Sequence, residues 1–180
     1  MGTDKADMEM RVGVSQLDYL LGLLDPFCVQ RAVLLGPKSA PERQVEEGVA
    51  RIRDVESCAG PMAGVIAALK AGEGKAVLVL ACDLPLLDAG ALLQIVNRRD
   101  QDKFATVFVG GDGNPEPLCC LYESRCLRFL EALAGDQKLS LRRFLNEVEI
   151  ERVLPASGEM LANVNDASEL EKVRLRLRPE

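Results

Sequence analysis

An unbroken run of apolar residues at positions 76–82 is followed directly by a carboxylate, Asp83. Runs without polar alternation are typical of strands whose two faces are both covered by helices. Gly74 and Pro85 bracket the run and leave too few residues for a buried helix. Because ligands of open α/β sheets bind beyond the carboxyl ends of the strands, Asp83 is a candidate binding residue, with a cation or donor expected beside it. The alternative is an aspartate that only stabilises the turn at residues 84–86.

Strand-like and helix-like patterns alternate along the rest of the chain. Leucines at helical spacing follow Ser15 and predict a helix that this serine caps. Further helices are predicted at residues 41–48, 65–71, 88–96, 126–133 and 170–177, and a short one is predicted to start near residue 140. Predicted strands cover residues 8–12, 32–35, 49–53, 105–109, 117–122 and 149–154. This alternation favours one three-layer α/β domain over residues 1–180, with a mostly parallel sheet.

Composition narrows the class of partner. The chain of 180 residues is 48% hydrophobic and has a net charge of -6, without a block of Lys or Arg. This balance is typical of a globular protein and argues against a nucleic-acid partner or an anionic membrane surface. No run reaches transmembrane length, and the N-terminus lacks the apolar core of a signal peptide. The six cysteines show no CxxC spacing, so they indicate reduced core residues of a cytoplasmic protein.

The absence of histidine from the sequence removes several kinds of chemistry. It excludes histidine-based catalytic triads, imidazole metal sites and the commonest general base. A bound metal must therefore be held by oxygen ligands, which favours magnesium over zinc.

A glycine-rich segment, Gly60-Pro61-Met62-Ala63-Gly64, stands at the predicted start of a helix. Glycines there allow a ligand to approach the backbone, and the free amides at a helix start suit a phosphate or an acceptor on a nucleotide base. The alternative is a tight turn whose small residues only allow the helix to pack closely on the sheet.

Two further polar groups are candidates. Asn163 and Asn165 are separated by one residue, so their amides share one face if the segment is extended. The next residue, Asp166, also fits an ordinary helix N-cap. Lys5 lies in the segment 2–5, which by itself indicates a polar chain end.

Taken together, five segments carry a resemblance to a known family. They are MGTDK at residues 1–5, GPMAG at 60–64, LACDLP at 80–85, EPLC at 116–119 and NVN at 163–165. In this order and spacing they resemble the molybdenum cofactor guanylyltransferase (MobA-like) family over essentially the whole chain. The resemblance implies a Rossmann-like nucleotidyltransferase fold. It also implies transfer of GMP from GTP to molybdopterin, with release of pyrophosphate and with Mg²⁺, or Mn²⁺, as the metal.

The resemblance also implies roles for individual residues. By position, Asp83 would hold the metal and Lys5 would neutralise triphosphate charge, so that both are catalytic and nucleotide-binding. The base would be read by Asp54 together with the turn that contains Gly60, Pro61 and Gly64. Asn163 and Asn165 would lie on the metal and pterin side.

The sequence departs from the family pattern at its start. The family begins with a buried strand and a glycine-rich loop of the form LAGGxSxRMG, whose amides cradle the triphosphate, and this chain begins at the final Met-Gly. We therefore expect the first strand to be missing from the sheet and transfer to be impaired. Two function classes stay open. One is the guanylyltransferase, with a CTP-dependent or sugar-phosphate nucleotidyltransferase as its variant; the other is a non-catalytic module that delivers the cofactor to molybdoenzymes or their chaperones.

Overall fold

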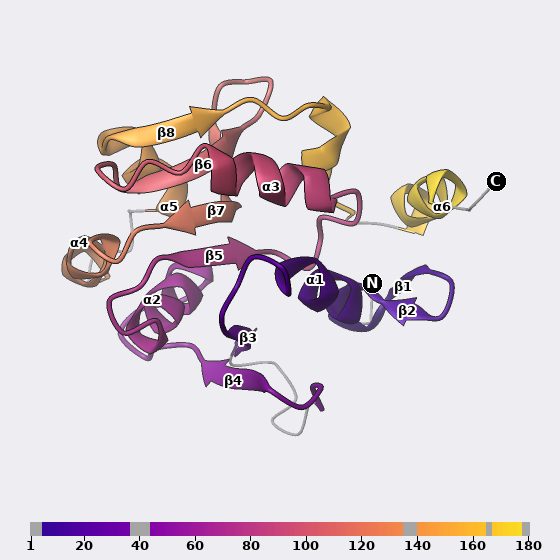
Figure 1. Cartoon of the computed structure of the whole chain (residues 1–180), viewed down its shortest axis with the longest axis horizontal. Helices are drawn as coiled ribbons and strands as arrows, with labels where there is room; N and C mark the ends of the chain where they lie inside the picture. Colours follow the sequence, from indigo (N-terminus) through magenta and orange to yellow (C-terminus); the bar gives the residue numbers. More distant parts are fainter. Residues whose placement is uncertain (1–4, 37–43, 135–139, 165–166, 178–180) are drawn as a thin grey trace.

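The computed structural model describes residues 5–36, 44–134, 140–164 and 167–177. Helices and strands are interspersed along these residues (Figure 1). The strands are β1 (Glu9–Arg11), β2 (Val14–Ser15), β3 (Arg31–Leu35), β4 (Val49–Arg53), β5 (Val77–Leu80), β6 (Ala105–Val109), β7 (Pro115–Tyr122) and β8 (Ile150–Val153). The α-helices are α1 (Gln16–Leu24), α2 (Pro61–Ala71), α3 (Ala89–Asn97), α4 (Cys126–Leu133), α5 (Leu141–Glu147) and α6 (Ala167–Arg176). Short 3₁₀ helices lie at Lys5–Asp7 and Gly158–Leu161.

Side-chain caps explain where three of the helices begin. The side chains of Ser15, Asp88 and Ser140 each accept a hydrogen bond from a backbone amide in the first turn of the helix that follows. Such caps satisfy amides that have no partner within the helix. The predicted polar helix at 41–48 is wrong for its described part, since residues 44–48 form no helix.

The main sheet has the strand order β5-β7-β6-β8. β7 runs antiparallel to both β5 and β6, whereas β6 and β8 are parallel. The sheet is therefore mostly parallel in strand direction, as predicted, since β5, β6 and β8 run the same way, but it is mixed because β7 runs against them. The reason lies in the turn between β6 and β7, where Gly113 has a positive φ of 76° and the amide of Gly110 donates to the carbonyl of Asn114. A tight turn of this kind reverses the chain and joins antiparallel neighbours.

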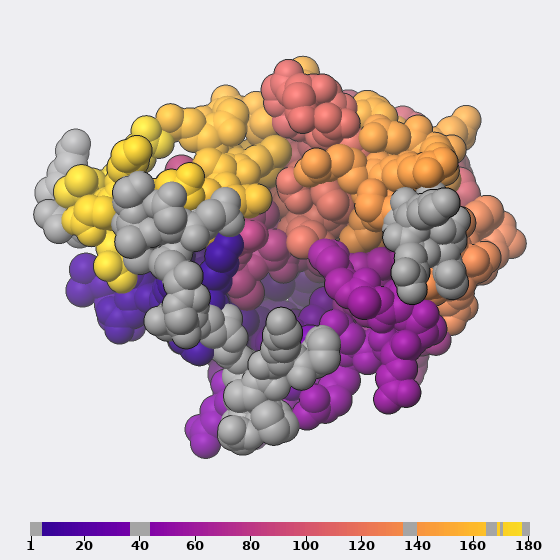
Figure 2. Space-filling model, turned by 180° about the vertical axis from the view of Figure 1, so that it is seen from behind, coloured from indigo at the N-terminus to yellow at the C-terminus, as the bar shows by residue number. Residues whose placement is uncertain are grey.

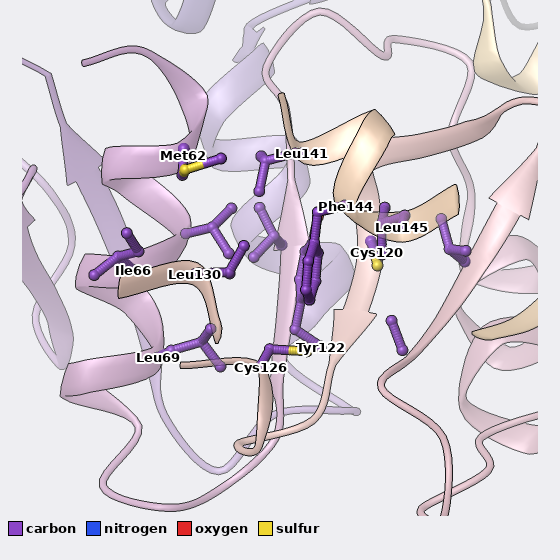
Figure 3. Close-up of a cluster of buried hydrophobic side chains, with 14 of the residues drawn as sticks. Met62, Ile66, Leu69, Cys120, Tyr122, Cys126, Leu130, Leu141, Phe144 and Leu145 are labelled. Carbon is purple, nitrogen blue, oxygen red and sulfur yellow. The ribbon is translucent and has the colours of Figure 1, made fainter. Parts of the chain in front are cut away.

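Helices cover both faces of the main sheet and give three layers, as the sequence predicts. Side chains of β5 alternate between two cores: Val79 packs with α2, α4 and α5, while Leu78 and Leu80 pack with α1 and α3. Figure 3 shows the first of these cores, in which α2 side chains such as Ile66 face Leu130 of α4.

The buried cysteines belong to these same cores. Cys119, Cys120 and Cys126 are buried, and no disulfide joins any of the six cysteines, all of which lie in the described residues. Burial raises the pKa of the Cys119 and Cys126 thiols to about 12, so both stay protonated and unreactive at neutral pH. The described chain contains no helix that is long and apolar enough to cross a membrane.

A second, parallel pair of strands, β3 and β4, stands apart from the main sheet. Figure 1 shows this pair beyond β5, and α2 contacts β3, β4 and β5. Seen from behind, the molecule is hollowed at its centre, between the purple atoms around α2 and the indigo atoms near the N-terminus (Figure 2). Among the described residues, no ladder joins β3 to β5. That a first strand is missing stays a prediction.

Candidate functional site

The chain leaves β5 through a turn that presents Asp83. The Asp83 side chain is 28% exposed, and its Oδ2 lies 3.4 Å from Nζ of Lys5, which is 33% exposed. The cation expected beside this carboxylate is thus supplied by a residue from the N-terminal 3₁₀ helix. The structure brings together two of the predicted site residues although 78 positions separate them.

The 163–165 segment meets the same turn through its backbone. The amide of Val164 donates to the carbonyl of Asp83 at 3.1 Å. Val164 is buried and Asn163 is exposed beside it. Asn165, the other predicted residue on this side, lies outside the described residues.

The donor set at Asp83 fits a magnesium or manganese ion that is shared with a nucleotide. Within the described ranges, no group of three or more acidic, cysteine or histidine side chains converges. Mg²⁺ typically binds to one or two carboxylates together with substrate phosphates, so one half-buried carboxylate suffices on the protein side. The Lys5 ammonium shows that the position beside Asp83 accepts a cation.

The second candidate group lies at the start of α2. Gly60 adopts φ 73° and ψ −159°, a backbone conformation that is essentially restricted to glycine, and Pro61 then begins the helix. No side chain caps the first turn of α2. Pro61 carries no N–H and the amide of Ala63 donates to the carbonyl of Gly60 at 3.0 Å, so the amide of Met62 is the one that the first turn offers to an acceptor.

Asp54 is adjacent to this turn. A Cβ added to Gly64 would lie 3.3 Å from Oδ1 of Asp54 and 3.5 Å from Cδ1 of Leu34. The glycine thus lets the carboxylate lie close to α2. Desolvation raises the pKa of Asp54, and none of the described cations forms an ion pair with it that would lower the pKa again. A hydrogen-bond donor arriving with a ligand would offset that cost.

With this geometry in view, comparison with known proteins decides the family. The model of the MobA-like NTP transferase domain matches residues 1–153. The chain belongs to the MobA-like NTP transferase family. It is therefore a nucleotidyltransferase, as the sequence motifs predict.

Individual relatives of this MobA-like chain agree. It is 28% identical over 176 residues to a probable molybdenum cofactor guanylyltransferase of Mycolicibacterium paratuberculosis, covering 94% of this chain and 86% of that protein. A protein of the same name from Flavobacterium johnsoniae is 26% identical over 129 residues, 71% of this chain and 67% of that one. The solved structure of molybdopterin-guanine dinucleotide biosynthesis protein A from Archaeoglobus fulgidus shares the fold. Its TM-score is 0.73 at 20% identity, and the match covers 97% of this chain and 91% of that chain.

Sequence reasoning missed three residues of the MobA-like chain that contact the Asp83 turn. They are Arg11, Gln16 and Tyr19, and each donates to a backbone carbonyl of residues 84–87. The sequence holds a clue for one of them: Gln16 lies four residues before Leu20, so a polar amide stands on the apolar face of α1.

Proposed function

We propose that this chain is a molybdenum cofactor guanylyltransferase, which transfers GMP from GTP to molybdopterin and releases pyrophosphate. The observation that carries the proposal is the Lys5–Asp83 pair, a cation and a carboxylate at the end of β5 in a nucleotidyltransferase. The names of the relatives support the identity of the substrates.

The reaction needs no nucleophile from the protein. The phosphate of molybdopterin attacks the α-phosphorus of GTP, a new P–O bond forms, and the bond to the departing pyrophosphate breaks. Catalysis of this kind consists of positioning and charge stabilisation, which a chain without histidine can supply.

Lys5 is assigned to the triphosphate. Its Nζ lies 3.4 Å from Asp83 Oδ2, whereas charge-assisted hydrogen bonds of this type are typically about 2.7–2.9 Å long. Nucleotide oxygens, which carry more charge than one carboxylate, would therefore compete well for the ammonium. Lys5 then offsets the charge that develops on pyrophosphate.

Asp83 is assigned to the metal. Its carboxylate, released from Lys5, would hold Mg²⁺ or Mn²⁺ together with phosphate oxygens of GTP. The ion, when bound, neutralises phosphate charge and polarises the α-phosphate. The hydrogen bond from Val164 to the Asp83 carbonyl holds the backbone in place, with Asn163 on the pterin side.

Guanine is assigned to the start of α2. The carboxylate of Asp54 accepts hydrogen bonds, and guanine offers N1 and N2 donors in an arrangement that cytosine lacks. In the turn of Gly60, Pro61 and Gly64 no side chain caps the helix, so the amide of Met62 is available to a base acceptor. A set of hydrogen bonds to a charged group contributes roughly 1.5–3 kcal/mol, about a tenfold to hundredfold preference.

The experiment measures pyrophosphate release by the purified chain from GTP, CTP and ATP in the presence of molybdopterin and Mg²⁺. We expect release with GTP, at least about tenfold faster than with the other two nucleotides. Asp54→Asn should lose that preference, and Asp102→Asn, which changes an exposed aspartate elsewhere, should keep it. Equal rates with all three nucleotides would contradict the assignment of guanine. Molybdopterin binding without pyrophosphate release would favour the delivery module instead.

A further inference from the structure

Three side chains from one N-terminal segment hold the turn that follows Asp83. Nη2 of Arg11 donates to the carbonyl of Pro85 at 3.0 Å, and Nε2 of Gln16 donates to the carbonyl of Leu84 at 3.3 Å. The hydroxyl of Tyr19 donates to the carbonyl of Leu87 at 2.9 Å. Residues 81–88 form neither helix nor strand, so side-chain donors replace the ladder that would otherwise fix these carbonyls.

The three donors are themselves held in place. The guanidinium of Arg11 lies over the ring of Tyr19, with its Cζ 3.3 Å from the ring centroid. Burial raises the pKa of Tyr19, so its hydroxyl keeps the proton that it donates. Gln16 is 0% exposed, and its backbone amide donates to the carbonyl of Met8 at 2.8 Å.

The same segment also carries Lys5. The amide of Met8 donates to the carbonyl of Lys5, so the bond from Gln16 to Met8 links the three donors to the cation at Asp83. One stretch of about fifteen residues therefore fixes both partners of the Lys5–Asp83 pair: it supplies the ammonium directly and restrains the carboxylate through the backbone of the turn.

A glutamine at position 16 is not the residue that would stabilise the fold most. Its Oε1 is buried and has no hydrogen-bond partner in the described structure. A leucine would have a similar volume and would not bury an unpaired acceptor at this fully buried position. The carbonyl of Leu84 would keep the amide of Leu87, at 3.4 Å, as a partner.

From these contacts we infer that Arg11, Gln16 and Tyr19 are positioning residues, which set the place of the Asp83 carboxylate for the metal and nucleotide. The inference rests on the proposed role of Asp83. Outer residues that orient a metal ligand typically affect metal affinity by about tenfold or more when they are removed.

The test measures Mn²⁺ affinity in the presence of GTP, by calorimetry, alongside thermal melts of each variant. Gln16→Leu should bind Mn²⁺ roughly tenfold more weakly without a lower melting temperature. Gln94→Leu is the matched control, because its Nε2 also donates to a carbonyl, that of Leu154 at 2.9 Å, away from Asp83. It should bind like the unaltered chain.

A second pair of variants removes one hydroxyl each. Tyr19→Phe should weaken Mn²⁺ binding, whereas Tyr122→Phe, which removes a hydroxyl bonded to the carbonyl of Pro117 at 2.9 Å, should not. If Gln16→Leu is unstable, the comparison of Tyr19→Phe with Tyr122→Phe tests the positioning role instead. Unchanged affinity in Gln16→Leu and Tyr19→Phe, with weaker binding in Asp83→Asn, would overturn the positioning role and leave the proposed function intact. Absence of Mn²⁺–GTP binding by the unaltered chain would overturn both.

Discussion

Two strands of similar apolar content are buried to different extents. All five residues of β6 are buried, whereas in β3 only Leu35 is buried and the other four are half-exposed. β6 lies between β7 and β8, but within the described chain β3 pairs with β4 alone. An apolar run therefore predicts that a strand forms, while its burial depends on neighbours along both edges.

The difference extends to the ion pairs. In the main-sheet region, Arg99 and Glu123 form a two-point contact with distances of 2.7 and 2.9 Å, and the Glu123 side chain is only 10% exposed. In the N-terminal region, Lys5 and Asp83 meet at one distance of 3.4 Å and are about one-third exposed. The first pair is built for stability, since it is close and bidentate. The second leaves both side chains partly accessible to a ligand, and it lies at the candidate site.

A matched pair of leucines tests this contrast and should show the largest effect. Leu121 of β7 is 6% exposed, whereas Leu34 of β3 is half-buried. Leu121→Ala should lower the free energy of unfolding by about 2–5 kcal/mol, and Leu34→Ala by about 1 kcal/mol, because the second change leaves a smaller cavity. Urea denaturation measures both. Equal losses would show that β3 is packed as tightly as the main sheet, and the comparison would fail.

Two carboxylates sharpen the contrast through pH, with a smaller effect. Hydrogen bonds from Lys103 and Arg98 lower the pKa of Glu151 in the folded protein below its value in the unfolded chain. The ionised carboxylate therefore stabilises the folded state at any pH above the unfolded-state pKa. This stabilisation is lost as the pH falls through the lower pKa of the folded state. Desolvation raises the pKa of Asp54 in the folded protein above its ordinary 3.8. The ionised carboxylate therefore destabilises the folded state. This destabilisation is relieved as the pH falls through the raised pKa of the folded state.

The two neutral variants should therefore differ in sign. At pH 7, Glu151→Gln should lose up to about 1 kcal/mol of stability, and Asp54→Asn should gain a fraction of that. Both differences should shrink as the pH is lowered through the acid range. Denaturation curves at several pH values measure both stability differences. A loss of stability in Asp54→Asn at pH 7 would mean that the carboxylate already has a partner in the protein and is not left available to a ligand.

Local sequence rules predicted the elements well because their causes are local. The helix starts follow from the caps Ser15, Asp88 and Ser140, and the strand β5 follows from an apolar run that ends at Asp83. The direction of β7 could not be read in this way. A buried strand shows the same apolar run whether its neighbours are parallel or antiparallel, and only the turn at residues 110–114 determines the direction.

The contacts of the candidate site could not be predicted as well from local sequence rules. Nothing in the sequence around Asp83 indicates that Lys5 lies beside it; the family motifs implied only that both residues serve the nucleotide and its metal, and their pairing depends on contacts between residues far apart in the chain. Arg11 and Tyr19 act through backbone carbonyls, which every residue possesses, so the turn that they hold gives no sequence pattern. The roles of Asp54, Gly60, Pro61, Gly64 and Asn163 stay predictions.

The most direct measurement of the central claim is a calorimetric titration of Mg²⁺–GTP into the unaltered chain, Asp83→Asn and Asp102→Asn. Asp83→Asn conserves the volume of a half-exposed side chain, so the melting temperature should stay within a few degrees of the unaltered chain. We predict that this variant loses metal-dependent binding of GTP, while Asp102→Asn binds like the unaltered chain. Equal binding by all three proteins would contradict the assignment of the metal and nucleotide to Asp83.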